Sequence, residues 1–334
     1  MQRLLFIVAI SFFINTVSMA QKPVLTFQKN NKFRIIQFTD IHHVVDNQFS
    51  NEVLTKLSIL LDSIQPDLVF FTGDIVISKD MKRGWDEVLY IVIKRQIPWA
   101  VVLGNHDDEF GSSRAQIMNY ITTKPFCLAE NGPKNIQGVG NYFLRIKKST
   151  GNKTAVILYG LDSNAYESGF NYCKYGYFNF NQVKWFQETS RKLTKENSYI
   201  PYPALAFFHI PLVEYSMLND NSKFTRIGQR NEVECYGALN TGMYAAMQQS
   251  KSVMGTFVGH DHENDYIGLL NSICLAYGRF SGGKTTYGNL TNGARVIELN
   301  DNVKGFKSWI YTTKNEVLDI VEFNGVELKK ACKF

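Results

Sequence analysis

The amino-acid sequence predicts a layered α/β fold, and three observations lead to this prediction. Short apolar runs recur along the 334 residues, several of these runs are continuous instead of alternating, and helical patterns lie between them. Continuous apolar strands are typical of sheets that are covered on both faces. Because 45% of the residues are hydrophobic, the chain can form a sizeable core, which excludes a disordered or low-complexity protein.

The elements follow one another in a regular order. Between the first two strand-like runs, the apolar residues of 53–64 fall on one helical stripe, which makes the early part a βαβαβ arrangement. Further helices are expected at 182–193, with Asn179 as the cap, and at 241–249. Short runs after Ile273 predict closing β-structure. The expected strands are 33–39, 67–72, 99–103, 142–146, 155–161, 204–208, 253–258, 294–299, 307–312 and 317–323.

The first twenty residues have the three-part pattern of a secretory signal peptide. Arg3 precedes an apolar run, and small residues at Ser18 and Ala20 predict cleavage before Gln21. A membrane anchor is disfavoured because the run is shorter than the roughly 20 residues that cross a bilayer. No linker or composition break follows. We therefore expect a signal peptide at 1–20 and a single domain at 21–334, secreted or periplasmic and without a membrane span.

Charge and cysteine content exclude other classes of protein. The chain has 36 Lys and Arg against 30 Asp and Glu, and because the basic residues are scattered, no nucleic-acid partner is indicated. Five cysteines without a CxxC pair argue against a zinc knuckle or a dense disulfide framework. Most of these cysteines are expected to be buried small hydrophobic residues, although one or two disulfides stay possible.

Polar residues that can bind metals appear where five of the expected strands end. The loops beyond the carboxyl ends of strands converge on one crevice in an open α/β sheet, so these groups can share a site. All six histidines of the chain lie in these loops. Glycines within them allow sharp turns and close approach of the backbone. The groups are Asp40 and His42; Gly73 and Asp74; Gly104, Asn105, His106 and Asp107; His209; and Gly259, His260, Asp261 and His262.

This set of donors predicts a centre of two metal ions. Imidazoles, carboxylates and one amide, without a thiolate, suit Fe, Mn or Zn, and about six to eight donors exceed what one tetrahedral zinc takes. A carboxylate that ends a strand between the others, such as Asp74, can bridge two ions about 3.5 to 4 Å apart. His43 is expected to point away from His42, because successive side chains alternate.

The series of motifs resembles the signature of the calcineurin-like metallophosphoesterases. It comprises D-x-H at 40–42, G-D at 73–74, G-N-H-D at 104–107, His209 and G-H-D-H at 259–262. The segments WAVVLGNHDDEF, SRAQIMNYI, ALAFFHIPLVEY, LNTGMYAAM and FVGHDHENDY are similar to the plant and fungal purple-acid-phosphatase-like branch with a short catalytic domain. The resemblance covers roughly residues 33–300 and implies a four-layer α/β/β/α sandwich of two mixed sheets.

The resemblance also implies a set of ligands, with one departure. In true purple acid phosphatases a tyrosine shortly after the GD aspartate binds ferric iron, whereas residues 75–78 here are Ile, Val, Ile and Ser. An obligatory ferric site is therefore not carried over, and two divalent or trivalent ions of Fe, Mn or Zn are expected. By resemblance, one metal is held by Asp40, His42, Asp74 and His262, the other by Asp74, Asn105, His209 and His260, and His106 acts on the substrate.

The expected activity is the hydrolysis of phosphate esters by a metal-activated water, with monoesters slightly preferred over diesters. Two cations neutralise the phosphate oxygens and lower the pKa of a bridging water. His106 can donate a proton to the leaving oxygen, and Asp107 is available to orient its ring. Arg114 and Arg279 are secondary candidates for holding phosphate oxygens, but solvation at the surface is the expected state of both.

Alternatives stay open at this point. A phosphodiesterase would use the same site, and a non-catalytic, metal-stabilised binding protein would keep the fold without turnover. His106 counts against the binding protein, which has no need for a proton donor. A zinc peptidase is poorly supported because the chain lacks HExxH. The aromatic and Asn-rich loops at 166–177 and 215–236 are expected to line an open cleft for a small-molecule or phosphopeptide phosphate ester.

Overall fold

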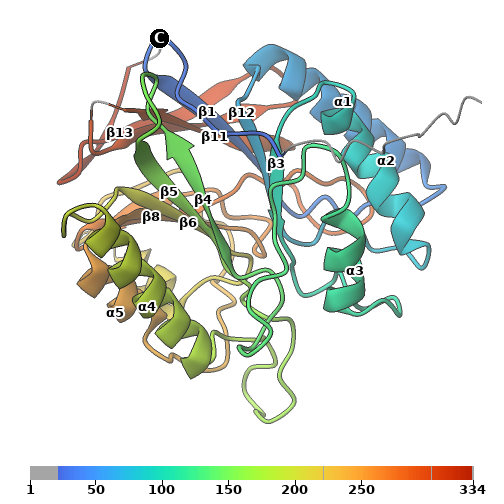
Figure 1. The fold of residues 1–334 in the computed structure, drawn as a ribbon. Coiled ribbons are helices and arrows are strands. Elements are labelled where there is room, and N and C mark those ends of the chain that lie inside the picture. Colours follow the sequence, from blue (N-terminus) through green and yellow to red (C-terminus); the bar gives the residue numbers. More distant parts are fainter. Residues whose placement is uncertain (1–21, 221, 302, 333–334) are drawn as a thin grey trace, which may run out of the picture.

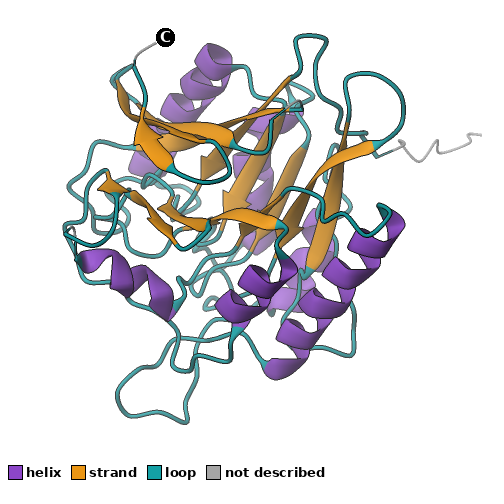
Figure 2. Cartoon of the chain, turned by 90° about the vertical axis from the view of Figure 1, so that its left-hand side faces the viewer, coloured by secondary structure: helices purple, strands orange, loops and turns teal. Residues whose placement is uncertain are grey.

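The computed structural model describes residues 22–220, 222–301 and 303–332, so the expected signal peptide lies outside the described residues. Two seven-stranded sheets are present. Helices cover the outer side of each sheet (Figure 1). Figure 2, turned by 90°, shows the strands in the middle of the molecule and the helices around them. This arrangement confirms the expected α/β sandwich of two mixed sheets.

The first sheet joins the N-terminal and C-terminal parts of the described chain. An inner strand, β1, pairs in parallel with β2 on one side and antiparallel with β11 on the other. Residues before position 40 therefore depend on residues near position 297 for one row of hydrogen bonds. In spatial order the strands are β14 (Leu328–Lys330), β13 (Val317–Phe323), β12 (Phe306–Thr312), β11 (Gly293–Asn300), β1 (Lys32–Phe38), β2 (Leu68–Thr72) and β3 (Trp99–Val102).

The second sheet has a parallel centre and antiparallel edges. Strands β5, β6, β8 and β10 pair in parallel, whereas β4 pairs antiparallel with β5, and β9 with β10. The carboxyl ends of the parallel strands point the same way, so the loops after β6 and β8 lie at one end of this sheet. In spatial order the strands are β4 (Tyr142–Lys147), β5 (Thr154–Gly160), β6 (Ala204–Phe207), β8 (Val253–Val258), β10 (Ile273–Tyr277), β9 (Ile267–Leu270) and β7 (Arg226–Ile227).

The core fills both faces of the sheets, which explains why the apolar runs are continuous. On β6, Leu205 and Phe207 belong to the apolar cluster between the sheets, and Ala204 and Ala206 belong to the cluster under the helices. The two sheets meet where the rings of Phe70 and Phe207 stack, with centroids 4.0 Å apart. Every side chain of such a strand is buried, so no polar alternation is left in the sequence.

Five α-helices of the described residues cover the sheets, three on one side and two on the opposite side (Figure 1). The caps follow local chemistry: the Asn47 side chain accepts hydrogen bonds at the start of α1, and Asn179 begins α4 as expected. The expected βαβαβ arrangement implied a helix where α2 lies, but no residue range was predicted for α2 or α3. The helices are α1 (Gln48–Ile64), α2 (Met81–Ile93), α3 (Arg114–Ile121), α4 (Phe180–Glu196) and α5 (Met243–Ser250), with a short 3-10 helix at Val213–Asn219.

Cysteine burial differs from the expectation. Cys127 and Cys274 are buried, Cys173 is half-buried, and Cys235 and Cys332 are exposed. The prediction that most cysteines are buried is therefore wrong, and all five are free thiols in this structure. Among the described residues, no helix combines the length and the apolar character that a membrane crossing requires.

Candidate metal centre

Five loops from both sheets converge at one end of the sandwich and carry the motif residues. Those after β1, β2 and β3 come from the first sheet, and those after β6 and β8 come from the second. Backbone hydrogen bonds tie the first two loops together: the N–H of Asp40 donates to the carbonyl of Gly73 at 3.0 Å, and that of His42 to the carbonyl of Asp74 at 2.9 Å. The strand ends thus meet as the sequence predicted.

Close approach of these loops requires glycine at two positions. A Cβ atom on Gly104 would lie 2.1 Å from Oδ1 of Asp74, and one on Gly259 would lie 1.9 Å from Oγ1 of Thr39. The backbone of the site is also strained, because non-glycine residues there have positive φ angles. These residues are Asp40 (φ 54), His42 (φ 48), Asp74 (φ 53) and His260 (φ 81).

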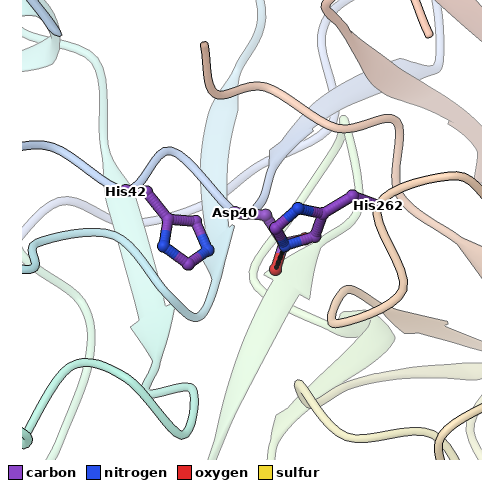
Figure 3. A group of neighbouring side chains, drawn as sticks. All are labelled: Asp40, His42 and His262. Atoms are coloured by element: carbon purple, nitrogen blue, oxygen red, sulfur yellow. Dashed lines mark ion pairs between the residues drawn. The ribbon is translucent and has the colours of Figure 1, made fainter. Parts of the chain in front are cut away.

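The first ligand cluster consists of Asp40, His42 and His262, whose potential ligand atoms all lie within 4.8 Å of one another. Figure 3 shows these three side chains, which come from the loops after β1 and β8. Nε2 of His262 is 3.5 Å from Oδ1 of Asp40. The ring of His262 stacks on Phe280 and on Tyr287, with centroid distances of 4.9 and 4.1 Å. Aromatic packing therefore fixes this imidazole.

The second ligand cluster consists of Asp74, His209 and His260, within the same limit of 4.8 Å. Oδ1 of Asn105 lies 3.1 Å from Nε2 of His209 and adds an amide oxygen. Oδ2 of Asp74 is 3.1 Å from Nε2 of His209 and 3.7 Å from Nε2 of His42 in the first cluster. Asp74 therefore lies between the two clusters, where a bridging carboxylate has to be.

The donor chemistry fits two metal ions. Nε2 of His42 and Nε2 of His260 are buried without a hydrogen-bond partner among the described residues, which is costly unless a ligand satisfies them. The other two histidines bond to backbone carbonyls through Nδ1: His209 to Thr72 at 2.7 Å and His262 to Tyr287 at 2.8 Å. These bonds orient the rings and leave Nε2 for a metal. The ligand roles themselves stay predictions.

Burial and charge set the protonation of the metal-free clusters. Burial lowers the pKa of His42 to about 4 and that of His260 to about 3, so both are neutral and ready to coordinate. Burial also acts against a charge on His209, but the carboxylate of Asp74 outweighs it and raises the pKa of His209 to about 9. A cation that binds the second cluster must therefore displace a proton from His209.

His106 lies beside the clusters and belongs to neither. Its ring centroid is 5.4 Å from that of His42, its side chain is 37% exposed, and its backbone N–H donates to Oδ1 of Asp74 at 2.8 Å. Nδ1 contacts Oε2 of Glu109 at 2.7 Å. The described residues provide no partner for Nε2, which leaves this nitrogen available to a substrate.

Asp107 does not contact the ring of His106, so the prediction that it orients this ring is wrong. Its carboxylate is buried and is occupied by backbone N–H groups of the loops after β2 and β3. Glu109, and not Asp107, contacts the imidazole of His106. Asp107 instead holds two ligand loops together: it accepts hydrogen bonds from Asp74 (2.9 Å), Ile75 (2.9 Å), Val76 (3.1 Å) and Gly104 (2.7 Å).

Sequence reasoning missed Glu109 and the role of Tyr166. The hydroxyl of Tyr166 donates to Oε1 of Glu109 at 2.8 Å and accepts from Nδ2 of Asn105 at 2.8 Å. Tyr166 begins the loop that was expected to line the cleft, and Glu109 follows the G-N-H-D motif by two positions. These two positions are the only indication in the sequence that Tyr166 and Glu109 belong to the site. Their contact joins residues 57 positions apart, which local sequence cannot show.

The remaining candidates are structural. Arg114 pairs with Asp162 and donates to the carbonyl of Gly104 at 2.6 Å, and Arg279 pairs with Asp265. Both guanidinium groups are largely buried, so the expectation of solvated surface arginines is wrong. Neither is free to hold a phosphate oxygen. His43 is fully buried and bonds to Glu87 through Nε2 at 2.7 Å, away from the clusters, as expected.

Comparison with known proteins places the chain among phosphoesterases. A family model described as calcineurin-like phosphoesterase matches residues 33–264. The chain is 32% identical over 323 residues to "Probable inactive purple acid phosphatase 29" of Arabidopsis thaliana, which covers 87% of this chain and 82% of that protein. It is also 32% identical over 317 residues to "Phosphatase DCR2" of Saccharomyces cerevisiae, covering 83% of this chain and about half, 53%, of that protein.

Solved structures share the fold at low sequence identity. A dimetal phosphatase from Danio rerio aligns with a TM-score of 0.59 and 12% identity, over 88% of this chain and 99% of that chain. The purple acid phosphatase PPD1 of yellow lupin (Lupinus luteus) aligns with a TM-score of 0.54 and 13% identity, over 87% and 53% of the two chains. With its family match and its purple-acid-phosphatase-like relatives, the chain belongs to the calcineurin-like phosphoesterase family.

Proposed function

We propose that this chain hydrolyses phosphate esters at a centre of two metal ions, with monoesters preferred over diesters. One observation carries the proposal: two buried ligand clusters lie on either side of Asp74, and a partly exposed histidine, His106, stands beside them and belongs to neither. A site that only stored metal would need the clusters but not this histidine.

The residues of the chain divide the work as follows. Bound ions supply the positive charge that neutralises phosphoryl oxygens and activates water for attack. His106 donates a proton to the leaving oxygen from Nε2, because Glu109 holds Nδ1 and fixes the ring. Asp107 keeps the loops of Asp74 and Gly104 in place through its bonds to the backbone. Preorganised groups of this kind need no rearrangement as charge develops.

A hollow beside the centre suggests the kind of substrate. It is lined by Tyr166, Phe170, Asn171 and Lys174, together with Glu167 and Ser168. Aromatic faces and a lysine suit an organic phosphate ester with a flat or anionic leaving group, such as a small molecule or a phosphopeptide. Because Tyr166 also contacts Asn105, this hollow adjoins the second cluster.

The names of several relatives favour a second candidate, a binding protein without turnover. Three Arabidopsis relatives of 30 to 32% identity carry the name "Probable inactive purple acid phosphatase". That word describes those proteins. In this chain the expected ligand residues and His106 are all present and grouped together.

A screen of turnover separates the candidates. The protein is stripped of metal, supplied with Mn, Fe, Zn or Mg in turn, and assayed with para-nitrophenyl phosphate and with bis(para-nitrophenyl) phosphate. We expect faster turnover of the monoester with at least one metal. Faster turnover of the diester would establish a phosphodiesterase. Two bound metals without turnover of either ester would favour the binding protein.

We also propose that residues 1–20 direct export and are removed before Gln21. The support is the pattern of Arg3, an apolar run and small residues at Ser18 and Ala20. Intact-mass analysis of protein secreted by its native host tests this. A mature protein that retains residues 1–20 would overturn the proposal.

A further inference from the structure

The loop after β5 brings two tyrosines onto the second ligand cluster and none onto the first. Tyr166 and Tyr175 face each other across a backbone bridge, and their rings stack with centroids 6.1 Å apart. The hydroxyl of Tyr166 bonds to Asn105, and the ring of Tyr175 packs edge-on against His260 at 4.4 Å. The loop that borders the substrate hollow is therefore also a wall of the metal centre.

The contact of Tyr166 decides which end of the Asn105 amide faces the cluster. A carboxamide has an oxygen and a nitrogen at nearly equivalent positions, and only the oxygen can bind a cation. The Tyr166 hydroxyl uses its single proton on Oε1 of Glu109 at 2.8 Å, so its oxygen can only accept from a neighbour. It accepts from Nδ2 of Asn105 at 2.8 Å, which turns Oδ1 toward His209 at 3.1 Å.

Glu109 extends this arrangement to the proposed proton donor. Its Oε1 receives the hydroxyl of Tyr166, and its Oε2 lies 2.7 Å from Nδ1 of His106. Glu109 thus connects Tyr166, and through it the Asn105 amide, to the ring of His106, whose Nδ1 also lies 3.4 Å from the Tyr166 hydroxyl. Partners of this kind, one step removed from a metal, typically change metal affinity or activity by about 10- to 100-fold when they are lost.

We propose that Tyr166 is a positioning residue, which sets the Asn105 amide as a ligand of the second metal and connects it through Glu109 to His106. The part that concerns His106 rests on the proposed function. The part that concerns Asn105 requires only that the second cluster binds a cation. The two parts therefore have separate tests.

The first test is metal binding by Tyr166→Phe, which keeps the ring and its stacking but removes the hydroxyl. We would titrate the metal-free protein with Mn²⁺ and measure binding by calorimetry. The Mn²⁺ affinity of one site should fall about 10- to 100-fold, and that of the other should not change. Tyr172→Phe is the matched control, because Tyr172 is in the same loop, is 76% exposed and donates its hydroxyl only to the carbonyl of Ala238. It should bind as the wild type does.

A rescue experiment separates orientation of the amide from general stabilisation. Both oxygens of an aspartate can bind a cation, so in an Asn105→Asp background the end that faces the cluster no longer matters. The fold-loss in Mn²⁺ affinity caused by Tyr166→Phe should shrink in that background. An equal fold-loss in both backgrounds would overturn the positioning role.

Other outcomes also decide against the proposal. Equal Mn²⁺ affinities of Tyr166→Phe and the wild type would overturn it, and so would an equal weakening of both sites. An iron-loaded protein with a visible phenolate band that Tyr166→Phe abolishes would show that Tyr166 is itself a ligand.

The second test is turnover at saturating metal. Tyr166→Phe should lower kcat on an alkyl phosphate by a larger factor than on para-nitrophenyl phosphate, because only the poor leaving group needs a well-placed proton donor. Equal factors on both esters would remove the connection to His106. If the wild type hydrolyses neither ester, the proposed function fails, while the result of the Mn²⁺ titration still stands.

Discussion

The two ligand clusters are similar in composition, but different parts of the chain supply the aromatic residues that pack against them. Each combines one carboxylate with two histidines, and in each one histidine bonds to a backbone carbonyl while the other has an unpartnered Nε2. The first cluster is packed by Phe280 and Tyr287, which follow β10. The second is packed by Tyr166 and Tyr175 from the loop after β5.

The two clusters therefore differ in their aromatic neighbours, and only the second has a neighbour that also lines the hollow. At the first cluster, Phe280 and Tyr287 stack on the imidazole of His262, and the carbonyl of Tyr287 also bonds to it. At the second cluster, Tyr166 contacts Asn105 and also borders the hollow. Both clusters draw residues from both sheets, so neither can form unless the sandwich is assembled. Besides the ligands themselves, these aromatic supports are therefore where a substitution can act on one cluster alone, whereas Asp74 between the clusters can affect both.

The largest effect is expected from Asp74→Asn, which should weaken metal binding at both clusters instead of at one. An amide has one oxygen donor and no charge, so it cannot bridge two cations, and both sites should weaken while turnover is abolished. Calorimetry with Mn²⁺ and the para-nitrophenyl phosphate assay measure this. Asp46→Asn is a matched control, because Asp46 also has a positive φ (59) but is 74% exposed. Two tightly bound ions in Asp74→Asn would contradict the bridging role.

The substitution His106→Gln should leave both clusters intact and impair only catalysis. Loss of a positioned acid lowers kcat by roughly 10²- to 10⁴-fold. The loss should be larger for alkyl phosphates than for para-nitrophenyl phosphate, whose leaving group needs little protonation. Steady-state kinetics and metal analysis on the same preparation test this. Unchanged kcat on alkyl phosphates, with both metals bound, would exclude His106 from the mechanism.

A smaller and one-sided effect is expected from Tyr287→Leu. The tyrosine ring stacks on His262 at 4.1 Å with an interplanar angle of 12°. Such aromatic pairs contribute about 0.5–1.5 kcal/mol beyond burial, so Mn²⁺ affinity of one site should fall by roughly 2- to 10-fold. The second site should keep its affinity, which makes this variant the counterpart of Tyr166→Phe. Equal weakening of both sites would show that the clusters are not supported independently.

The smallest effect concerns pH and the metal-free protein. The pKa of His209 is raised from its ordinary value of 6.5 to about 9, so its charge stabilises the fold fully below pH 6.5. This contribution is lost as the pH rises to about 9. We expect the Tm of chelator-treated protein to fall over this range, and to fall less in His209→Gln. A Tm that falls equally in both would assign the pH dependence to other groups.

The sequence predicted the site better than it predicted the surroundings of the site. Asp40, Asp74 and His209 each lie two residues beyond the end of a strand, and the direction of a strand determines where the next residues lie, so local pattern was sufficient. Arg114 shows the opposite case, because its partner Asp162 is 48 residues away and no local signal reports that pairing. An arginine with a buried partner looks the same in sequence as a solvated one.

The error at Asp107 has a related cause. Because Asp107 is next to His106 in sequence, a contact between their side chains was expected. In the structure the Asp107 carboxylate instead accepts hydrogen bonds from four backbone N–H groups. Unpaired backbone donors in buried loops are costly, so they take the nearest acceptor. Glu109, three residues after His106, contacts the imidazole instead.

The pairing of β1 with β11 has a consequence for how the protein is made. The strand that leads to Asp40 and His42 emerges early in synthesis, yet its partner at Gly293–Asn300 emerges about 270 residues later, judged from the register of Lys32 with Asn300. Contacts of such long sequence separation slow folding and leave an apolar strand edge exposed meanwhile. Ile35, Ile36 and Phe38 are fully buried in the finished sheet. The nascent chain therefore carries an aggregation-prone edge until its last strands arrive, and a fragment that stopped at residue 264, where the family match ends, would keep that edge permanently.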